Sequence, residues 1–167
     1  MKTMQFTPEY IIMHNNVFVR DNARIEGISK YGKQIFTPKI IFEDNVCIEQ
    51  NLHLTCANLV KIGKNTAIAA NVTITDIHHR YDDIHTPIEH QDIQVSPVSI
   101  GEDCKIYNNA VILPGTTIGK HCTVGANSVV SGTYPDYCVI VGAPAKIIKR
   151  YSFEKQAWLR IDAKITL

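Results

Sequence analysis

Residues 100–129 divide into five hexapeptides, IGEDCK, IYNNAV, ILPGTT, IGKHCT and VGANSV. Each begins with isoleucine or valine, and Val130 begins the next unit in the same phase. Neither the 3.6-residue period of a helix nor the two-residue alternation of one long strand produces a strict period of six. A short strand followed by a turn does produce it, and three such units close one three-sided coil.

The same period is present upstream of residue 100. Six further aliphatic or aromatic residues carry it, with one eight-residue step after the third: Phe42, Ile48, Leu54, Ile62, Ile68 and Ile74. These side chains are predicted to point inward and to stack on their counterparts in neighbouring coils. Small residues four positions later suit a tight corner, and Cys104 and Cys122 at such positions are expected to be buried fillers. Gly and Asn are expected to supply left-handed turn conformations.

The 167 residues are enough for one domain, which we divide into three parts. Residues 1–24 have weak periodicity and are expected to cap the first coil. Residues 25–150 are predicted to form the all-β solenoid. Residues 151–167 are predicted to form a short α-helix and tail, because Ser152 is a good N-cap and apolar residues follow at helical spacing.

Composition excludes several classes of function. A formal net charge of +1 and the absence of basic blocks give no indication of nucleic-acid binding. No 18-residue apolar run predicts a membrane span, and the N-terminus does not resemble a signal peptide. The five cysteines form no CxxC pair, so we expect a reduced, cytoplasmic protein without a structural metal.

The hexapeptide period stops at residues 76–97, which predicts a loop extruded from the solenoid. Four of the seven histidines lie there: His78, His79, His85 and His90. Loops on rigid scaffolds often carry function, and histidine is the usual general base near neutral pH. Asp76, at the start of the loop, could orient a histidine or simply cap a turn.

Residues 100–119 and 124–130, together with Gly142-Ala143-Pro144-Ala145-Lys146, resemble the hexapeptide-repeat acyltransferases. The most similar subgroup is the bacterial lipopolysaccharide and capsule sugar O-acetyltransferases, and the resemblance covers roughly residues 40–160. It implies a left-handed parallel β-helix, a homotrimer, and acetyl-CoA bound in the groove between subunits.

The same resemblance assigns candidate site residues. Asp76-x-His78 is similar to the family's catalytic segment and favours His78 as general base, while His79, directly before Arg80, matches the base of other relatives and stays open. Ile77 and Lys105 stand where relatives often have His and Trp. The positions implied for coenzyme A are Asn108, Ala126, Ser131, Gly132, Lys146 and Lys149.

These patterns predict an acetyl-CoA-dependent O-acetyltransferase acting on a sugar hydroxyl of a cell-surface polysaccharide or its precursor. Transfer would be direct, in a ternary complex. Three alternatives remain at this point: N-acylation of an amino sugar, possibly nucleotide-linked; a metalloenzyme of the γ-carbonic anhydrase type, which needs three histidines; and a trimeric scaffold without catalytic activity.

Overall fold

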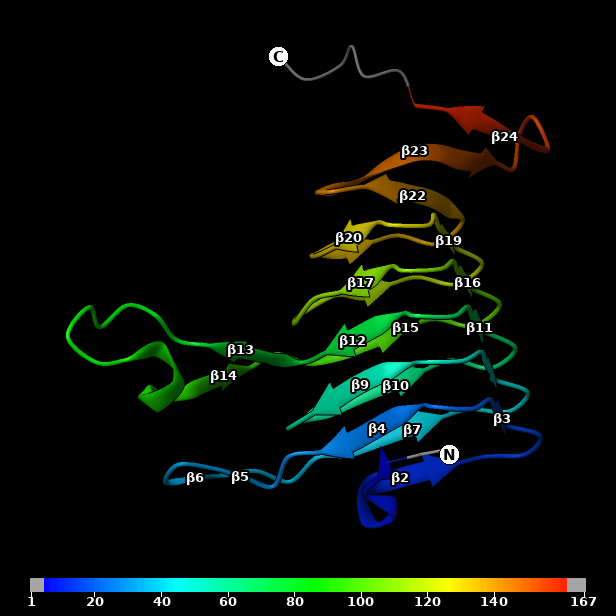
Figure 1. Cartoon of the computed structure of the whole chain (residues 1–167). Helices are drawn as coiled ribbons and strands as arrows, with labels where there is room; N and C mark the ends of the chain where they lie inside the picture. Colours follow the sequence, from blue (N-terminus) through cyan, green and yellow to red (C-terminus); the bar gives the residue numbers. More distant parts are fainter. Residues whose placement is uncertain (1–4, 162–167) are drawn as a thin grey trace.

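The computed structural model describes residues 5–161, and its short strands wind into a stack of coils with three faces (Figure 1). The predicted left-handed parallel β-helix is confirmed. Because each strand pairs in parallel with strands of neighbouring coils, every sheet runs along the length of the stack. No helix within residues 5–161 is both long enough and apolar enough to cross a membrane.

Each face of the stack is one sheet. Face 1 contains β1 (Gln5–Phe6), β4 (Arg24–Gly27), β9 (His53–Cys56), β12 (Thr73–Thr75), β17 (Val111–Ile112) and β20 (Val129–Val130). Face 2 contains β2 (Ile11–Met13), β7 (Lys39–Phe42), β10 (Leu59–Ile62), β15 (Val98–Ile100), β18 (Thr117–Ile118) and β21 (Thr133–Tyr134). Face 3 contains β3 (Phe18–Val19), β8 (Cys47–Ile48), β11 (Ala67–Ile68), β16 (Lys105–Ile106), β19 (Thr123–Val124), β22 (Cys138–Gly142), β23 (Ala145–Ser152) and β24 (Ala157–Arg160).

The hexapeptide residues form the core as predicted. The twelve apolar residues that carry the period of six, from Phe42 to Val130, are each at most 2% exposed. They stack in register, as Ile68, Ile106 and Val124 do on face 3. The buried Cys104 and Cys122 fill a corner next to this core, as expected. The period of six residues therefore corresponds to a continuous column of stacked apolar side chains on the inner side of each face.

Asparagines occupy the corners and hold the coils in register. Asn51, Asn71, Asn109 and Asn127 all have φ between 56° and 61°, in the left-handed region. Each of the first three donates its side-chain amide to the side-chain oxygen of the next, over 2.8, 3.2 and 3.0 Å. Gly101 serves a different purpose from the one expected: a Cβ there would lie 2.7 Å from the backbone of Gly119 in the next coil. Close stacking, and not a left-handed turn, explains that glycine.

Replacing Asn71 with alanine is expected to lower the free energy of unfolding by about 2 kcal/mol. The variant loses two side-chain hydrogen bonds, and alanine is strained at φ 60°. Urea denaturation at matched protein concentration measures the change. Asn71→Gly, which removes the same bonds without the strain, should lose less. Equal stability of the alanine variant and the wild type would contradict this role of the column.

The solenoid begins earlier than predicted. β2 and β3 pair in parallel and in register with β7 and β8 of the next coil, so residues 11–24 belong to the first coil and do not cap it. Only β1 and the short 3-10 helix η1 (Pro8–Tyr10) precede this coil among the described residues. The hexapeptide period is weak here because the apolar side chains of Ile12, Met13 and Phe18 are exposed. Fewer apolar residues in this coil therefore fall at inward-facing positions of the repeat.

The predicted C-terminal helix is wrong for residues 151–161; residues 162–167 lie outside the described part of the chain. Ser152 does accept a hydrogen bond from the Lys155 amide, at 3.2 Å, but only a turn follows. The chain then returns as β24, antiparallel to β23, and Trp158 packs edge-on against Tyr151. A helix of about ten residues is marginal in water, so strand pairing and aromatic packing override its spacing pattern.

Two hairpins leave the stack at the same corner, where the chain passes from face 1 to face 2 (Figure 1). The first hairpin, residues 28–38, contains β5 (Lys30–Tyr31) and β6 (Gln34–Ile35) and was not predicted. The second hairpin, residues 76–97, is the predicted loop; it contains β13 (Ile77–His79), β14 (Ile93–Val95) and the 3-10 helix η2 (Ile88–His90). The coil between them turns this corner tightly at residues 57–58.

Candidate functional site

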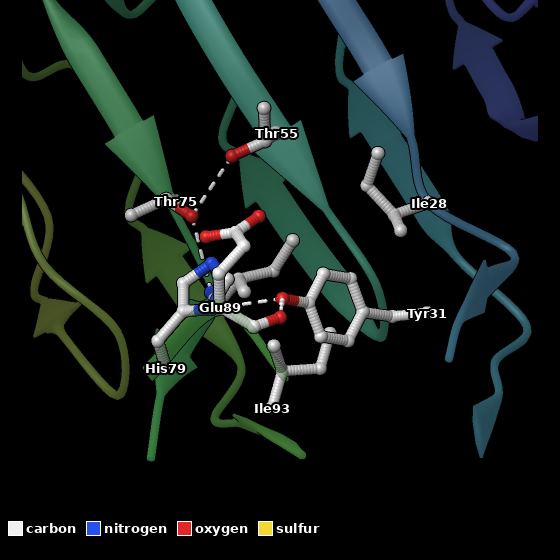
Figure 2. A pocket seen from close by; sticks show the side chains of 8 residues that line it. Ile28, Tyr31, Thr55, Thr75, His79, Glu89 and Ile93 are labelled. Carbon is white, nitrogen blue, oxygen red and sulfur yellow. Dashed lines mark hydrogen bonds between the residues drawn. The ribbon is translucent and has the colours of Figure 1, made fainter. Parts of the chain in front are cut away.

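A pocket of about 280 Å³ lies between the two hairpins. β9 and β12 contribute Thr55 and Thr75, while the hairpins supply the remaining side chains (Figure 2). Its full lining is Ile28, Tyr31, Thr55, Thr75, Ile77, His79, Glu89 and Ile93. The walls are mainly apolar, with an imidazole and a carboxylate as their titratable groups beside the phenol of Tyr31. Such a combination is typical of a small-molecule site.

The structure places His79, and not His78, in this pocket. Successive side chains of a strand point to opposite sides, so Ile77 and His79 line the pocket together. His78 is exposed, and its ring lies edge-on to that of Tyr81 with centroids 5.7 Å apart. The geometry therefore favours the alternative that the sequence ranked second.

The first hairpin is bound to the second by its side chains. The Gln34 amide group donates to the Ile93 carbonyl at 3.0 Å and accepts from the Ile93 amide at 2.7 Å. The Tyr31 hydroxyl donates to the Glu89 carbonyl at 2.5 Å and lies 3.4 Å from Nδ1 of His79. The rings of Tyr31 and His79 meet edge to face, with centroids 5.3 Å apart (Figure 2).

Sequence reasoning missed Tyr31 and Glu89. Tyr31 lies 48 residues before His79, in a stretch without a recognisable motif. The available signal was the gap in the apolar period between Ile25 and Ile40, which is too long for one corner. Desolvation, and then the negative charge of Glu89, raise the pKa of Tyr31, a phenol that is protonated at neutral pH even without this shift.

Asp76 caps a turn and does not orient a histidine. Its fully buried carboxylate accepts hydrogen bonds from the amides of Ala57, Asn58 and Leu59, at 2.8, 2.7 and 2.9 Å, and from the Cys56 thiol at 3.5 Å. Burial and the neighbouring carboxylate raise the pKa of the Cys56 thiol to about 12. The Asp76 carboxylate thus holds the tight corner that separates the two hairpins.

The rest of the second hairpin is braced by its own polar groups. Asp83 accepts hydrogen bonds from the His85 amide and the Thr86 hydroxyl, and these bonds lower the pKa of Asp83. His85 and His90 are exposed and do not line the pocket of His79. Within residues 5–161, no three His, Cys, Asp or Glu side chains gather closely enough to hold a metal ion.

Four of the six coenzyme A candidates lie on two corners, and the two lysines lie on β23 of face 3. Asn108 and Ala126 are exposed one coil apart on the corner between face 3 and face 1. The turn at residues 142–145 follows on that corner, held by a 3.1 Å bond from the Gly142 amide to the Ser128 hydroxyl, and the exposed Lys146 comes next. Lys149 lies further along β23, half-buried.

The remaining two candidates lie elsewhere. Ser131 and Gly132 are exposed on the corner between face 1 and face 2, which is the corner that carries the hairpins. Tyr107, two residues after Lys105, is 44% exposed, and the Lys105 ammonium lies 5.6 Å from the centre of its ring. One chain therefore does not bring all six candidates together.

Known proteins resemble this chain in both repeat and sequence. The family model "Bacterial transferase hexapeptide (six repeats)" matches residues 97–132. The galactoside O-acetyltransferase of Escherichia coli K12 is 30% identical over 164 residues, which cover 94% of this chain and 75% of the relative. The chain belongs to the hexapeptide-repeat transferase family. The period of six residues is the signature of that family.

Two further comparisons extend this hexapeptide-repeat assignment. The putative lipopolysaccharide biosynthesis O-acetyl transferase WbbJ of Escherichia coli K12 is 40% identical over 126 residues, or 71% of this chain; the match spans 64% of that relative's length. AntD, an N-acyltransferase from Bacillus cereus solved with dTDP and 3-hydroxybutyryl-CoA, superposes with a TM-score of 0.74 over 92% of this chain and 78% of AntD. At 18% identity, the likeness to AntD shows the fold alone.

Proposed function

We propose that the protein is an acetyl-CoA-dependent O-acetyltransferase whose acceptor is a sugar hydroxyl of a cell-surface polysaccharide or its precursor. The observation that carries this proposal is the placement of His79 in an apolar pocket between two hairpins of a rigid solenoid. Relatives named as a lipopolysaccharide biosynthesis O-acetyl transferase and a galactoside O-acetyltransferase support the reaction class.

In this proposal His79 is the general base. Its neutral imidazole accepts the proton of the acceptor hydroxyl as that oxygen attacks the thioester carbonyl. When the carbon–sulfur bond breaks, the imidazolium returns the proton to the departing sulfur. Transfer is direct, so the pocket needs no nucleophilic side chain, and its lining contains no cysteine. The mainly apolar walls exclude water that would otherwise compete with the acceptor.

We further propose a homotrimer, because one chain separates the two halves of the site. The exposed corner with Asn108, Ala126 and Lys146 offers small side chains and a cation, which suit a pantetheine chain and a phosphate. The pocket of His79 lies on a different corner of the same chain. A neighbouring copy would bring one corner against the other. Light scattering should give a mass about three times the 18.7 kDa of the chain, and a monomer active at assay concentration would contradict this proposal.

The decisive experiment is an assay of acetyl transfer from acetyl-CoA to a panel of sugars and amino sugars. The free thiol of coenzyme A that each transfer releases measures the reaction. Mass spectrometry of the product should show one added acetyl group. Mild base should remove that group, because an ester hydrolyses under conditions that leave an amide intact. A product that keeps its acetyl group in mild base would be an amide, which would contradict O-acylation and indicate N-acylation. If no acceptor promotes thiol release, the assignment as a transferase fails.

A further inference from the structure

We infer that Tyr31 is a positioning residue that fixes the tautomer of His79, with the proton on Nδ1 and the lone pair on Nε2. The inference deepens the proposed function, because it explains why one ring nitrogen of His79 is ready to accept a proton. The contact that carries it joins the two hairpins inside the pocket.

A tyrosine hydroxyl has a single proton to donate. Tyr31 donates this proton to the Glu89 carbonyl, 2.5 Å away. A carbonyl offers only lone pairs, so it cannot be the donor in this contact. The phenol oxygen therefore has only lone pairs left for Nδ1 of His79, which lies 3.4 Å from it. Nδ1 satisfies this contact only as an N–H donor, and a neutral ring with Nδ1 protonated leaves Nε2 free.

The opposite tautomer is disfavoured at this place. A bare Nδ1 would face the lone pairs of the phenol oxygen, unless the Tyr31 proton turned away from the Glu89 carbonyl. That turn would exchange a short hydrogen bond for a long one. Free histidine in water prefers the proton on Nε2, so the protein has to reverse an intrinsic preference.

The surrounding contacts keep the phenol in place. Gln34 holds the first hairpin on the backbone of Ile93 through two hydrogen bonds, and the edge-to-face contact fixes the angle between the rings of Tyr31 and His79. A phenol is protonated at neutral pH, and desolvation and the charge of Glu89 raise the pKa of Tyr31 further, so its hydroxyl proton is available for the Glu89 carbonyl. Tyr31 acts on the reaction only through His79, and we assign it no contact with substrate.

The test is the tautomer of His79 in protein labelled with ¹⁵N-histidine, read from the nitrogen chemical shifts at a pH where the ring is neutral. His79→Gln assigns the signals. The wild type should show a protonated Nδ1 and a bare Nε2, and Tyr31→Phe should shift the population toward a protonated Nε2. A bare Nδ1 in the wild type, or an unchanged tautomer in Tyr31→Phe, would overturn the inference.

Kinetics supply a second readout. Tyr31→Phe keeps the aromatic edge and should lower kcat about five- to tenfold, the effect of losing one hydrogen bond of about 1 kcal/mol, with the KM for acetyl-CoA unchanged. Tyr137→Phe, on the aromatic cluster at the C-terminal end, is the matched control and should behave as wild type. If His79→Ala keeps its activity while the tautomer result holds, the assignment of His79 as general base fails and the structural inference stands.

Discussion

Replacing His79 with alanine should lower kcat for acetyl transfer by about 10²- to 10⁴-fold, the contribution of a positioned general base. The imidazole is half-buried in the pocket, and no other histidine lines it. The stacked core does not involve His79, so the variant should keep its oligomeric state and its unfolding midpoint. Steady-state assays with saturating acetyl-CoA, at several acceptor concentrations, separate kcat from KM.

His78→Ala is the matched control for that variant. It removes the adjacent imidazole from the same strand, but on the exposed side of the hairpin beside Tyr81. Activity within about twofold of wild type is expected, since surface substitutions away from special features rarely matter. The reverse result, with His78→Ala inactive and His79→Ala active, would reject the pocket of His79 as the reaction site.

Asp76→Asn should lower the free energy of unfolding by about 2–4 kcal/mol. The carboxylate accepts four hydrogen bonds in a fully buried place, three of them from consecutive backbone amides. A side-chain amide has one acceptor oxygen, so its NH₂ group would face at least one of these N–H donors. Urea denaturation at fixed protein concentration measures the loss.

The same variant distinguishes a structural role from a catalytic one. At low temperature, where Asp76→Asn is still folded, kcat should stay within about threefold of wild type, because Asp76 does not contact His79. Asp82→Asn is the control in the same hairpin: its ion pair with Arg80 is exposed and screened by solvent, so its loss should change stability little. If Asp76→Asn had unchanged stability and a large loss of kcat, the result would instead support Asp76 as a group that orients a catalytic histidine.

The core can be predicted from the sequence because the same requirement, an apolar side chain facing inward, recurs in every coil. Ile106 and its counterparts must face inward in every coil, and the left-handed corners favour Asn at positions such as Asn71. The ends lack this redundancy. At residues 152–161 the helical spacing of three apolar residues competes with pairing to β23, and local sequence contains no information about that partner strand.

The site was harder to predict because it depends on contacts between distant segments. Alternation along a strand indicates that His78 and His79 point to opposite sides, but not which side meets a pocket. That outcome depends on the pairing of His79 with Ile93 in the second hairpin and on the docking of Gln34 from the first. The sequence leaves the role of Asp76 open for a similar reason, since its partners belong to the previous coil.

The placement of the two hairpins on one corner, with a tight coil between them, has a consequence for synthesis of the chain. The ribosome releases the first hairpin before the residues that it docks against exist, because domains emerge N-terminus first. Tyr31 and Gln34 find their partners only after residues 76–97 have been added. A nascent chain that stops at residue 75 can stack its first coils, yet it has no pocket. The pocket of His79 therefore forms only once the second hairpin has followed the third coil out of the ribosome.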